Sequence, residues 1–124
     1  MKIAVYGSLR KGDYNFERFE QWYNNSEVTG FKYLTTTKIV GYKMYDLGWG
    51  YPCAVKTDDE SEMVVDIIEV SEDCGKSITY MEVGAGYKPS FVEVDGHKCV
   101  IYLYKSPEGS LVKSGDWIKH KNIN

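Results

Sequence analysis

The sequence predicts an α+β fold, in which strands and helices do not alternate regularly along the chain. Short runs rich in Val, Ile, Tyr and Thr are typical of strands, and they occur at residues 2–6, 28–47, 53–57, 63–70 and 91–104. Two other segments, residues 14–24 and 71–84, have the spacing of helices. Because many strands accompany only two helices, a repeated βαβ architecture is not expected.

The N-terminal segment predicts a buried strand followed by a capped helix. The apolar run that starts at Ile3 favours a strand over residues 2–6, which stops at Gly7. Asp13 is suited to cap the helix expected over residues 14–24, since its carboxylate accepts hydrogen bonds from N–H groups of the first turn. Four aromatic residues fall near one face of this helix and are expected in the core, namely Phe16, Phe19, Trp22 and Tyr23.

The following segment predicts consecutive strands without an intervening helix. Residues 28–47 form either two strands or one long bent strand, because Gly30 and Gly41 interrupt them. The sequence at residues 48–52 indicates a turn, and a short strand is expected at residues 53–57.

The second half of the chain begins with an acidic loop at residues 57–62, which is expected to be a solvated hairpin tip. Residues 63–70 are the longest apolar run and predict a central strand, in which Asp66 needs a polar partner or a wet face. Ser71 begins a helix with two acidic residues in its first turn, as the helix dipole favours, and the pattern ends near residues 82–84.

The C-terminal third predicts a hairpin and a polar tail. Phe91–Val94 and Lys98–Tyr104 are the two strands of the hairpin, since Asp95-Gly96 between them is a strong turn signal. The tail from residue 106 onward is polar and carries no predicted element. Two of its residues are apolar enough to hold it against the body of the protein, Trp117 and Ile118.

Length and composition indicate a globular protein with one domain, residues 1–124. The chain is 43% hydrophobic and 27% charged, which is ordinary for such a domain. A net charge of −3 and an isoelectric point near 5.4 offer no basic surface for nucleic acid or an anionic membrane. There is no signal-peptide pattern and no apolar stretch near the roughly 20 residues that span a bilayer, so a cytoplasmic location is expected.

Cysteine and histidine are too few and too scattered to predict a metal site or a catalytic nucleophile. The cysteines, at positions 53, 74 and 99, form no Cys-x-x-Cys pair, which favours reduced thiols over disulfides or zinc ligands. His97 lies in the predicted hairpin turn and His120 in the polar tail, and both are expected to be solvated. No P-loop or zinc-protease motif occurs, so carboxylates remain as candidate catalytic groups.

Two places in the sequence carry candidate chemistry. Gly7-Ser8 directly follows the first strand, and such a loop either presents backbone N–H groups to an anion or carbonyl, or is simply a turn. Glu82 has apolar or aromatic neighbours on both sides and precedes the loop Gly84-Ala85-Gly86. A carboxylate that faces a cleft is desolvated, which raises its pKa toward the range of a general base; the alternative is an ordinary surface glutamate.

Several short motifs follow one another along nearly the whole chain. They are Tyr6-Gly7-Ser8-Leu9-Arg10, Tyr51-Pro52-Cys53-Ala54-Val55, Ile68-Glu69-Val70, Ile78-Thr79-Tyr80-Met81-Glu82, Ile101-Tyr102-Leu103-Tyr104 and Gly115-Asp116-Trp117. Their order and spacing resemble the gamma-glutamylcyclotransferase-like family, which includes the AIG2-like proteins. The chain departs from the family pattern at four positions, Asp66, Thr79, Val83 and Pro89.

The resemblance implies a small mixed, barrel-like sheet with flanking helices, and an enzyme of the transferase or lyase type. Its substrate would be a γ-glutamyl amine or a small γ-glutamyl peptide. The α-amino nitrogen of the substrate would attack its own γ-carbonyl carbon, releasing the amine and forming 5-oxoproline. Because the substrate supplies the nucleophile, the resemblance implies neither a metal nor another cofactor.

The resemblance also assigns roles to residues of this chain. Glu82 would act as the catalytic acid and base that moves the protons. The loop formed by Tyr6, Gly7, Ser8 and Leu9 would hold the glutamyl group with its backbone N–H groups, which suffice to stabilise a developing oxyanion. Tyr6 would add a wall or a hydroxyl group to this site.

Two further residues are candidates for substrate binding. Arg10 either offsets the charge of the substrate carboxylate or is a surface residue, and Tyr87 would line the pocket. The departures near Glu82 motivate an alternative hypothesis, a non-catalytic small-molecule-binding module that uses the same pocket. A purely structural or partner-binding domain is a third possibility, to which no residue pattern points.

Overall fold

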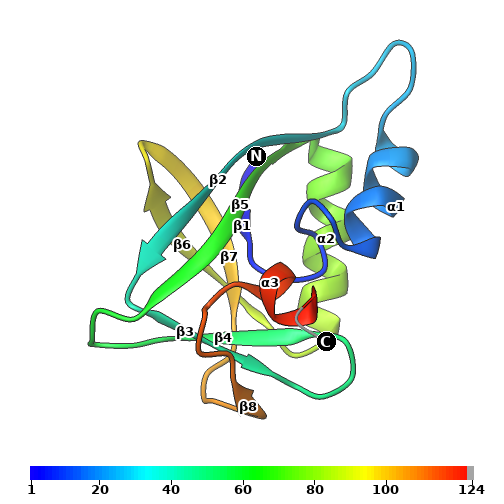
Figure 1. Ribbon diagram of the computed structural model, residues 1–124. Helices are drawn as coiled ribbons and strands as arrows, with labels where there is room; N and C mark the ends of the chain where they lie inside the picture. The colour runs from blue at the N-terminus through cyan, green and yellow to red at the C-terminus, as the bar shows by residue number, and fades with distance from the viewer. Residues whose placement is uncertain (123–124) are drawn as a thin grey trace.

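In the described part of the chain the strands form two sheets, and three helices accompany them. We describe a computed structural model, which covers residues 1–122 of the chain (Figure 1). The larger sheet has the order β2 (Phe31–Val40), β5 (Glu62–Val70), β1 (Lys2–Val5), β7 (His97–Leu103) and β6 (Lys88–Val94). The smaller sheet has the order β4 (Pro52–Lys56), β3 (Tyr42–Asp46) and β8 (Ser110–Leu111). The helices are α1 (Tyr14–Tyr23), α2 (Glu72–Gly84) and α3 (Trp117–Asn122).

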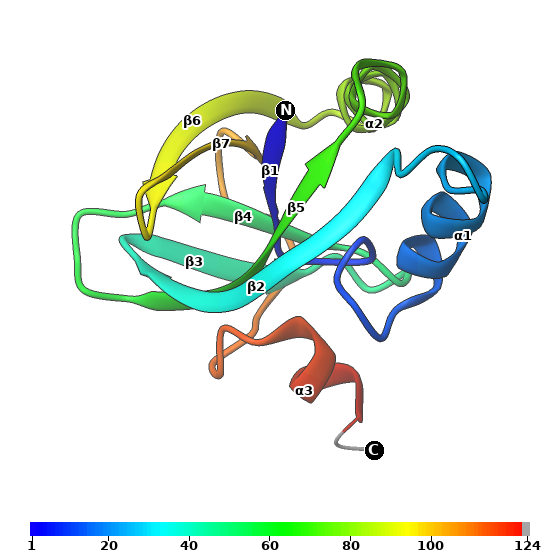
Figure 2. The same ribbon diagram turned by 90° about the horizontal axis from the view of Figure 1, so that it is seen from above.

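The larger sheet is mixed and curls without closing into a barrel. Strand β1 pairs antiparallel with β5 and parallel with β7, whereas β2 and β6 are the two edges. The view from above shows this sheet curving around the smaller one, with α1 and α2 on its other side (Figure 2). The predicted α+β class with a barrel-like sheet and flanking helices is therefore confirmed.

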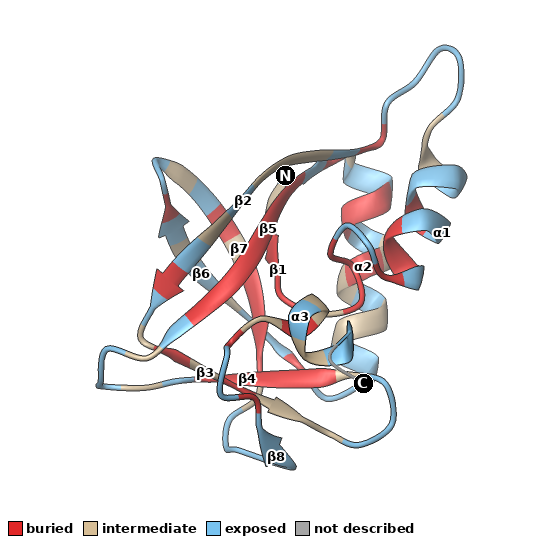
Figure 3. Ribbon diagram, in the orientation of Figure 1, coloured by how far each residue is buried: buried red, intermediate tan, exposed pale blue. Residues whose placement is uncertain are grey.

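Two hydrophobic cores lie on the two faces of the larger sheet, because side chains alternate along each strand. In β1, Ile3 and Val5 face the core shared with α1 and α2, whereas Ala4 faces the core shared with the smaller sheet and α3. In β5, Ile68 belongs to the core shared with α1 and α2, whereas Ile67 belongs to the core shared with the smaller sheet and α3. Figure 3 shows β5 buried over most of its length, which explains why its sequence is a continuous apolar run.

The predicted cap at Asp13 and the predicted start of a helix at Ser71 are confirmed. Asp13 accepts a hydrogen bond from the N–H of Tyr14 at the start of α1, and the Ser71 hydroxyl accepts one from Cys74 at the start of α2. Residues 28–47 contain two strands rather than one, because Gly41 between them has a φ of 93°, which turns the chain.

Asp66 has the polar partners that its position in an apolar strand requires. Its side chain is 1% exposed and accepts hydrogen bonds from the hydroxyl of Thr36 at 2.7 Å and the N–H of Lys11 at 2.8 Å. The Nε of Arg10 lies 3.3 Å from the same carboxylate. A charge buried in this way is tolerated because it is paired and hydrogen-bonded.

The structure corrects several expectations for single elements. Trp22 is 66% exposed and does not join Phe16 and Phe19 in the core. Strand β6 begins at Lys88, three residues earlier than predicted. The tail contains β8 and α3, which sequence periodicity does not detect because they have only two and six residues.

The cysteines are buried, and the histidines contact polar side chains. Cys53, Cys74 and Cys99 are buried free thiols. Both histidines are partly exposed to solvent, and each also has a polar neighbour: His97 Nδ1 lies 2.9 Å from Lys2 Nζ, and His120 Nε2 lies 2.9 Å from Asp46. Within residues 1–122, no helix has the length and apolar character needed to cross a membrane.

Candidate active site

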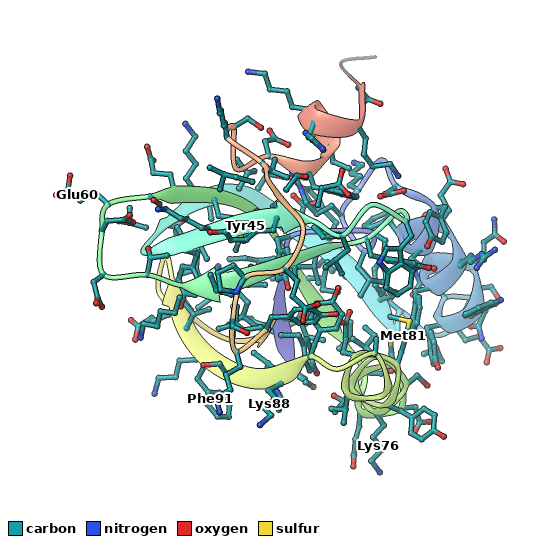
Figure 4. All side chains as sticks on the ribbon, turned by 90° about the horizontal axis from the view of Figure 1, so that it is seen from below. Tyr45, Glu60, Lys76, Met81, Lys88 and Phe91 are labelled. Carbon is teal, nitrogen blue, oxygen red and sulfur yellow. The ribbon has the colours of Figure 1, made fainter. Side chains whose placement is uncertain are left out.

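A cavity of about 230 Å³ lies at the C-terminal end of β1, between this strand, the last turns of α2 and the loop before β4. It is smaller than the roughly 300–1,000 Å³ typical of sites for drug-sized ligands, so it suits a small metabolite. Figure 4 shows Met81 on the side of α2 that faces the body of the protein, whereas Lys76 points away. The residues that line the cavity are Ala4, Val5, Tyr6, Gly7, Ser8, Leu9, Trp49, Tyr51, Pro52, Met81, Glu82, Ala85, Tyr87 and Tyr102.

The loop after β1 lines the cavity and carries backbone N–H groups without a hydrogen-bond partner among the described residues. No acceptor within residues 1–122 pairs with the backbone N–H of Gly7, Ser8 or Leu9. The loop itself is held in a turn, since the N–H of Arg10 donates to the carbonyl of Gly7 at 3.0 Å. Such a run of N–H groups is suited to an anion or a carbonyl oxygen.

Because Gly7 has no side chain, this loop can lie close to the start of strand β4. A Cβ atom at this position would lie only 2.8 Å from Cγ of Pro52, at the start of β4. Contacts this short do not occur without a shift of one group, so a larger residue at position 7 would displace either the loop or Pro52.

The acidic group of the cavity is Glu82, in the last turn of α2. Burial raises the pKa of the Glu82 carboxyl from 4.5 to about 7, because removal of water disfavours the charged form. Among residues 1–122, no positively charged group opposes this effect. A carboxyl with a pKa near neutrality is suited to accept and return a proton.

Two tyrosines that line the cavity with Glu82 have hydroxyl groups that backbone carbonyls hold in place. Tyr6 donates to the carbonyl of Tyr102 and Tyr87 donates to the carbonyl of Pro52, both at 2.6 Å. Burial, followed by neighbouring ionisable groups, raises the pKa of Tyr6 and of Tyr87 above the ordinary value. These phenols therefore stay protonated near neutral pH, and they shape the cavity rather than act as bases.

Thr79, one of the departures from the family pattern, is part of the same network. Thr79 lies one turn before Glu82 on α2, and its hydroxyl is 2.6 Å from the hydroxyl of Tyr102. Burial is the main cause that raises the pKa of Tyr102, so this phenol also remains neutral. The substitution thus places a neutral hydrogen-bonding group beside the ring that lines the floor of the cavity.

The structure brings together all but one of the predicted site residues. Glu82, Tyr87 and the loop from Tyr6 to Leu9 line one cavity. Arg10 does not line it, and it is also not a surface residue, because it is only 6% exposed. Its guanidinium group is paired with Asp66 at 3.3 Å and with Asp116 at 2.8 Å.

Sequence reasoning does not identify three prominent residues of the cavity. Trp49, Tyr51 and Tyr102 supply rings to its wall, and they come from two separate elements of the chain. The available signal for two of them is the segment Gly48-Trp49-Gly50-Tyr51-Pro52, where large aromatic residues occur in a turn. Within residues 1–122, His, Cys, Asp and Glu side chains form no cluster of three that could hold a metal ion.

Comparison with known proteins supports the resemblance over almost the whole chain. Residues 3–119 match the family described as gamma-glutamyl cyclotransferase, AIG2-like. A protein of Pyrococcus horikoshii, described as a putative gamma-glutamylcyclotransferase, is 34% identical over 119 residues, which cover 94% of this chain and 90% of that protein. A protein of Methanocaldococcus jannaschii with the same description is 34% identical over 121 residues, which cover 93% of each chain.

Solved structures share the fold. The crystal structure of the Pyrococcus horikoshii protein matches with a TM-score of 0.75 and 30% identity, and the match covers 100% of this chain and 99% of that one. An AIG2-like protein of Mus musculus matches with a TM-score of 0.67 over 86% of this chain and 78% of its own, at 16% identity, which shows the fold alone. The chain therefore belongs to the AIG2-like gamma-glutamyl cyclotransferase family.

Proposed function

We propose that this protein is a γ-glutamyl cyclotransferase, which releases 5-oxoproline from a γ-glutamyl amine or a small γ-glutamyl peptide. The observation that carries the proposal is the pairing of two features in one small cavity. One is the Glu82 carboxyl, with a pKa of about 7, and the other is the run of unpaired N–H groups from Gly7 to Leu9. Together they supply a proton carrier and an oxyanion site.

The bound substrate must be bent so that its α-amino nitrogen reaches its own γ-carbonyl carbon. A small cavity favours such a geometry, and holding two reacting groups at attack distance removes much of the entropic barrier. The N–H groups of Gly7, Ser8 and Leu9 are the donors for the oxygen atoms of the glutamyl group. The tyrosine rings exclude water from the reacting atoms.

The reaction forms one C–N bond and breaks another. Glu82 removes a proton from the substrate α-ammonium group, and the resulting amine attacks the γ-carbonyl carbon. Glu82 then returns a proton to the leaving nitrogen as its bond to that carbon breaks. In balance, the α-ammonium group loses two protons and becomes the lactam N–H, and the leaving amine gains two and departs as an ammonium ion at neutral pH.

The proposal is tested by mass spectrometry of 5-oxoproline after incubation with γ-glutamyl amino acids, γ-glutamyl amines and glutathione. The wild-type protein is expected to form 5-oxoproline from at least one of them, and Glu82→Gln is expected to lose this activity while its circular dichroism spectrum is unchanged. A matched control is Glu72→Gln, which changes an exposed glutamate at the other end of the same helix. Unchanged turnover in Glu82→Gln contradicts the assignment.

Thermal shift measurements with the same compounds distinguish the alternative, a binding module without catalysis. A binding module is stabilised by its ligand and leaves it intact, whereas the enzyme converts it. A compound that raises Tm and yields no 5-oxoproline over a prolonged incubation therefore favours the binding module.

A further inference from the structure

The outer part of the cavity is formed by aromatic rings. Trp49 lines the cavity although it is 68% exposed, and its ring meets that of Tyr51 edge to face with centroids 5.7 Å apart. The Tyr51 ring in turn meets Tyr14 at 6.2 Å, and the hydroxyl groups of these two tyrosines are hydrogen-bonded. Tyr51 is therefore held in place from α1, whereas most of the Trp49 side chain is exposed to solvent.

The backbone around Trp49 is arranged to present this ring. Gly48 and Gly50, on either side of it, have φ values of 90° and 95°, in the region that favours glycine. Asp46 fixes the base of the loop, since its carboxylate accepts a hydrogen bond from the N–H of Gly48 at 2.8 Å. Trp49 is therefore not part of a hydrophobic core, and its ring is available for contact with a ligand of the cavity.

The position of the leaving group follows from the proposed function, on which this inference rests. The glutamyl half of the substrate occupies the buried end, against Gly7 and Leu9, and Glu82 must reach the scissile nitrogen. Substituents on that nitrogen then extend toward the exposed side of the cavity. The exposed lining residues are Trp49 and Ala85, so the leaving group passes between them.

The charges of the cavity wall disfavour an ionic mode of recognition. Among the described residues that line the cavity, Glu82 is the one with a carboxylate, and none is a lysine or arginine. Arg18 and Lys121 do approach Tyr14, at 5.3 and 5.8 Å from its ring centroid, but they do not line the cavity. The outer wall thus offers flat rings rather than charges.

We propose that Trp49, supported by Tyr51, is a specificity-determining residue that selects γ-glutamyl amides of aromatic amines. The aromatic ring of the leaving group stacks against the exposed ring of Trp49 or meets its edge, the arrangements that aromatic pairs favour. This contact exists in the bound substrate and in the transition state alike, so its loss acts on KM more than on kcat.

The test compares kcat/KM for γ-glutamyl-phenethylamide, γ-glutamyl-cyclohexylethylamide and γ-glutamyl-ethylamide. They present a flat ring, an apolar ring of similar size and no ring. The wild-type protein is expected to prefer phenethylamide over ethylamide by about tenfold, with the cyclohexyl compound in between. In Trp49→Ala this preference is expected to fall to about twofold, mainly through KM of the phenethylamide.

Two further variants separate ring recognition from a general effect on the loop. Trp49→Phe keeps a flat ring and is expected to retain most of the preference. Trp22→Ala removes a tryptophan of similar exposure, 66%, from α1 and is expected to leave the preference unchanged.

The possible failures are distinguishable. Equal kcat/KM values for the three compounds, or a loss in Trp49→Ala that is the same for all of them, overturn the inference and leave the proposed function standing. Equal values for the phenethyl and cyclohexyl compounds overturn the selection of aromatic rings. Absence of 5-oxoproline from every γ-glutamyl compound, with the protein folded, overturns the proposed function and this inference with it.

Discussion

At the scale of single residues, the chemistry of the protein depends on how one carboxyl group is desolvated. Most of the 18 acidic residues are ordinary surface charges, and the sequence around Glu82 differs from theirs only by its apolar neighbours. Burial in the cavity raises the pKa of Glu82 to about 7. Two consequences of this shift can be measured, one in catalysis and one in stability.

The first concerns the pH profile of the proposed reaction. As a general base Glu82 must be ionised, so kcat/KM is expected to rise with pH through an apparent pKa near 7 and to level off above it. Steady-state rates of 5-oxoproline formation between pH 5 and 9 would measure this limb. An ascending limb centred near 4.5, the ordinary value, would show that the acting carboxylate is not desolvated.

The second consequence concerns stability. The direction in which the pKa of Glu82 is shifted determines whether the free energy of unfolding rises or falls with pH. A carboxyl whose pKa is raised on folding contributes stability that is fully present below about pH 4.5 and lost as pH rises through about 7. Above pH 7 the ionised Glu82 costs roughly 3 kcal/mol, so Glu82→Gln is expected to be more stable than wild type by up to that amount at pH 8.

Urea unfolding at pH 8 and at pH 4 measures this difference. At pH 4 the carboxyl is protonated in the folded protein and mostly protonated in the unfolded chain, so the two proteins are expected to have nearly equal free energies of unfolding. A difference that is the same at both pH values would come from the amide itself and would contradict desolvation of Glu82. The control Glu72→Gln, at an exposed position, is expected to show little change at either pH.

At the scale of elements, the site is made where the end of β1 meets β4, α2 and β5. The loop after β1 contacts Pro52 of β4 through Gly7, and Asp66 of β5 holds the same loop through Arg10 and Lys11. Each of these contacts joins segments far apart in the sequence. The geometry of the N–H groups therefore depends on packing that is distant from them along the chain.

Gly7→Ala tests the close approach of the loop to β4. The added methyl group would overlap with Pro52, and overpacking of this kind is expected to cost roughly 1–3 kcal/mol. The displaced N–H groups are also expected to lower kcat/KM for any γ-glutamyl substrate at least tenfold. Urea unfolding and steady-state kinetics measure the two effects.

Gly84→Ala is the control, because nothing lies within 4 Å of a Cβ at this helical position. Alanine is the better helix former, so this variant is expected to be as stable as wild type or more stable by up to about 1 kcal/mol. If Gly7→Ala were equally harmless, the contact with Pro52 would not be tight in solution.

Asp66→Ala tests the anchor beneath the loop. It leaves the buried Arg10 with Asp116 alone and deprives Lys11 and Thr36 of their acceptor. Removal of one partner from a buried ion pair is expected to cost about 3–5 kcal/mol, whereas Glu72→Ala, which breaks the exposed pair with Lys76, is expected to cost less than about 1 kcal/mol. Equal losses in urea unfolding would show that burial of the Asp66 pair is unimportant.

At the scale of the whole molecule, the short C-terminal helix joins parts that the sheets leave separate. Trp117 of α3 is 1% exposed and belongs to the core of the smaller sheet, and its Nε1–H donates to the α1 cap Asp13 at 3.1 Å. Lys121 lies 2.9 Å from the same carboxylate, and His120 lies 2.9 Å from Asp46 of β3. Helix α3 thus connects α1 to the second sheet.

Trp117→Ala is expected to lower the free energy of unfolding by about 3–5 kcal/mol, because it empties a large buried site. Trp117→Phe keeps most of the volume but loses the hydrogen bond to Asp13, and it is expected to cost less, about 1–3 kcal/mol. The exposed Trp22→Ala serves as the control in the same thermal and urea measurements. A cost for Trp117→Ala no larger than that of the control would mean that α3 is not docked in solution.

Much of the fold could be predicted because it is encoded locally. The cap at Asp13, the helix start at Ser71, the apolar run of β5 and the glycine at position 41 act on neighbouring residues, and the structure confirms each of them. The lining residues Tyr102 and Trp49 were not predictable in the same way. They come from a late strand and a loop, and their sequence neighbours do not show that they face Glu82.

Local sequence patterns are enough to predict the α+β class and the order of the main strands and helices, and the motifs of the chain indicate the family. These follow from alternation, helical spacing and capping, which depend on residues close together in the chain. Three features follow from long-range packing alone: Arg10 is paired with Asp66 and Asp116 and does not line the cavity, the tail forms a docked helix, and aromatic rings form the outer wall of the cavity. The reason is that burial and pairing depend on long-range packing, which brings together residues that have no local signal of contact.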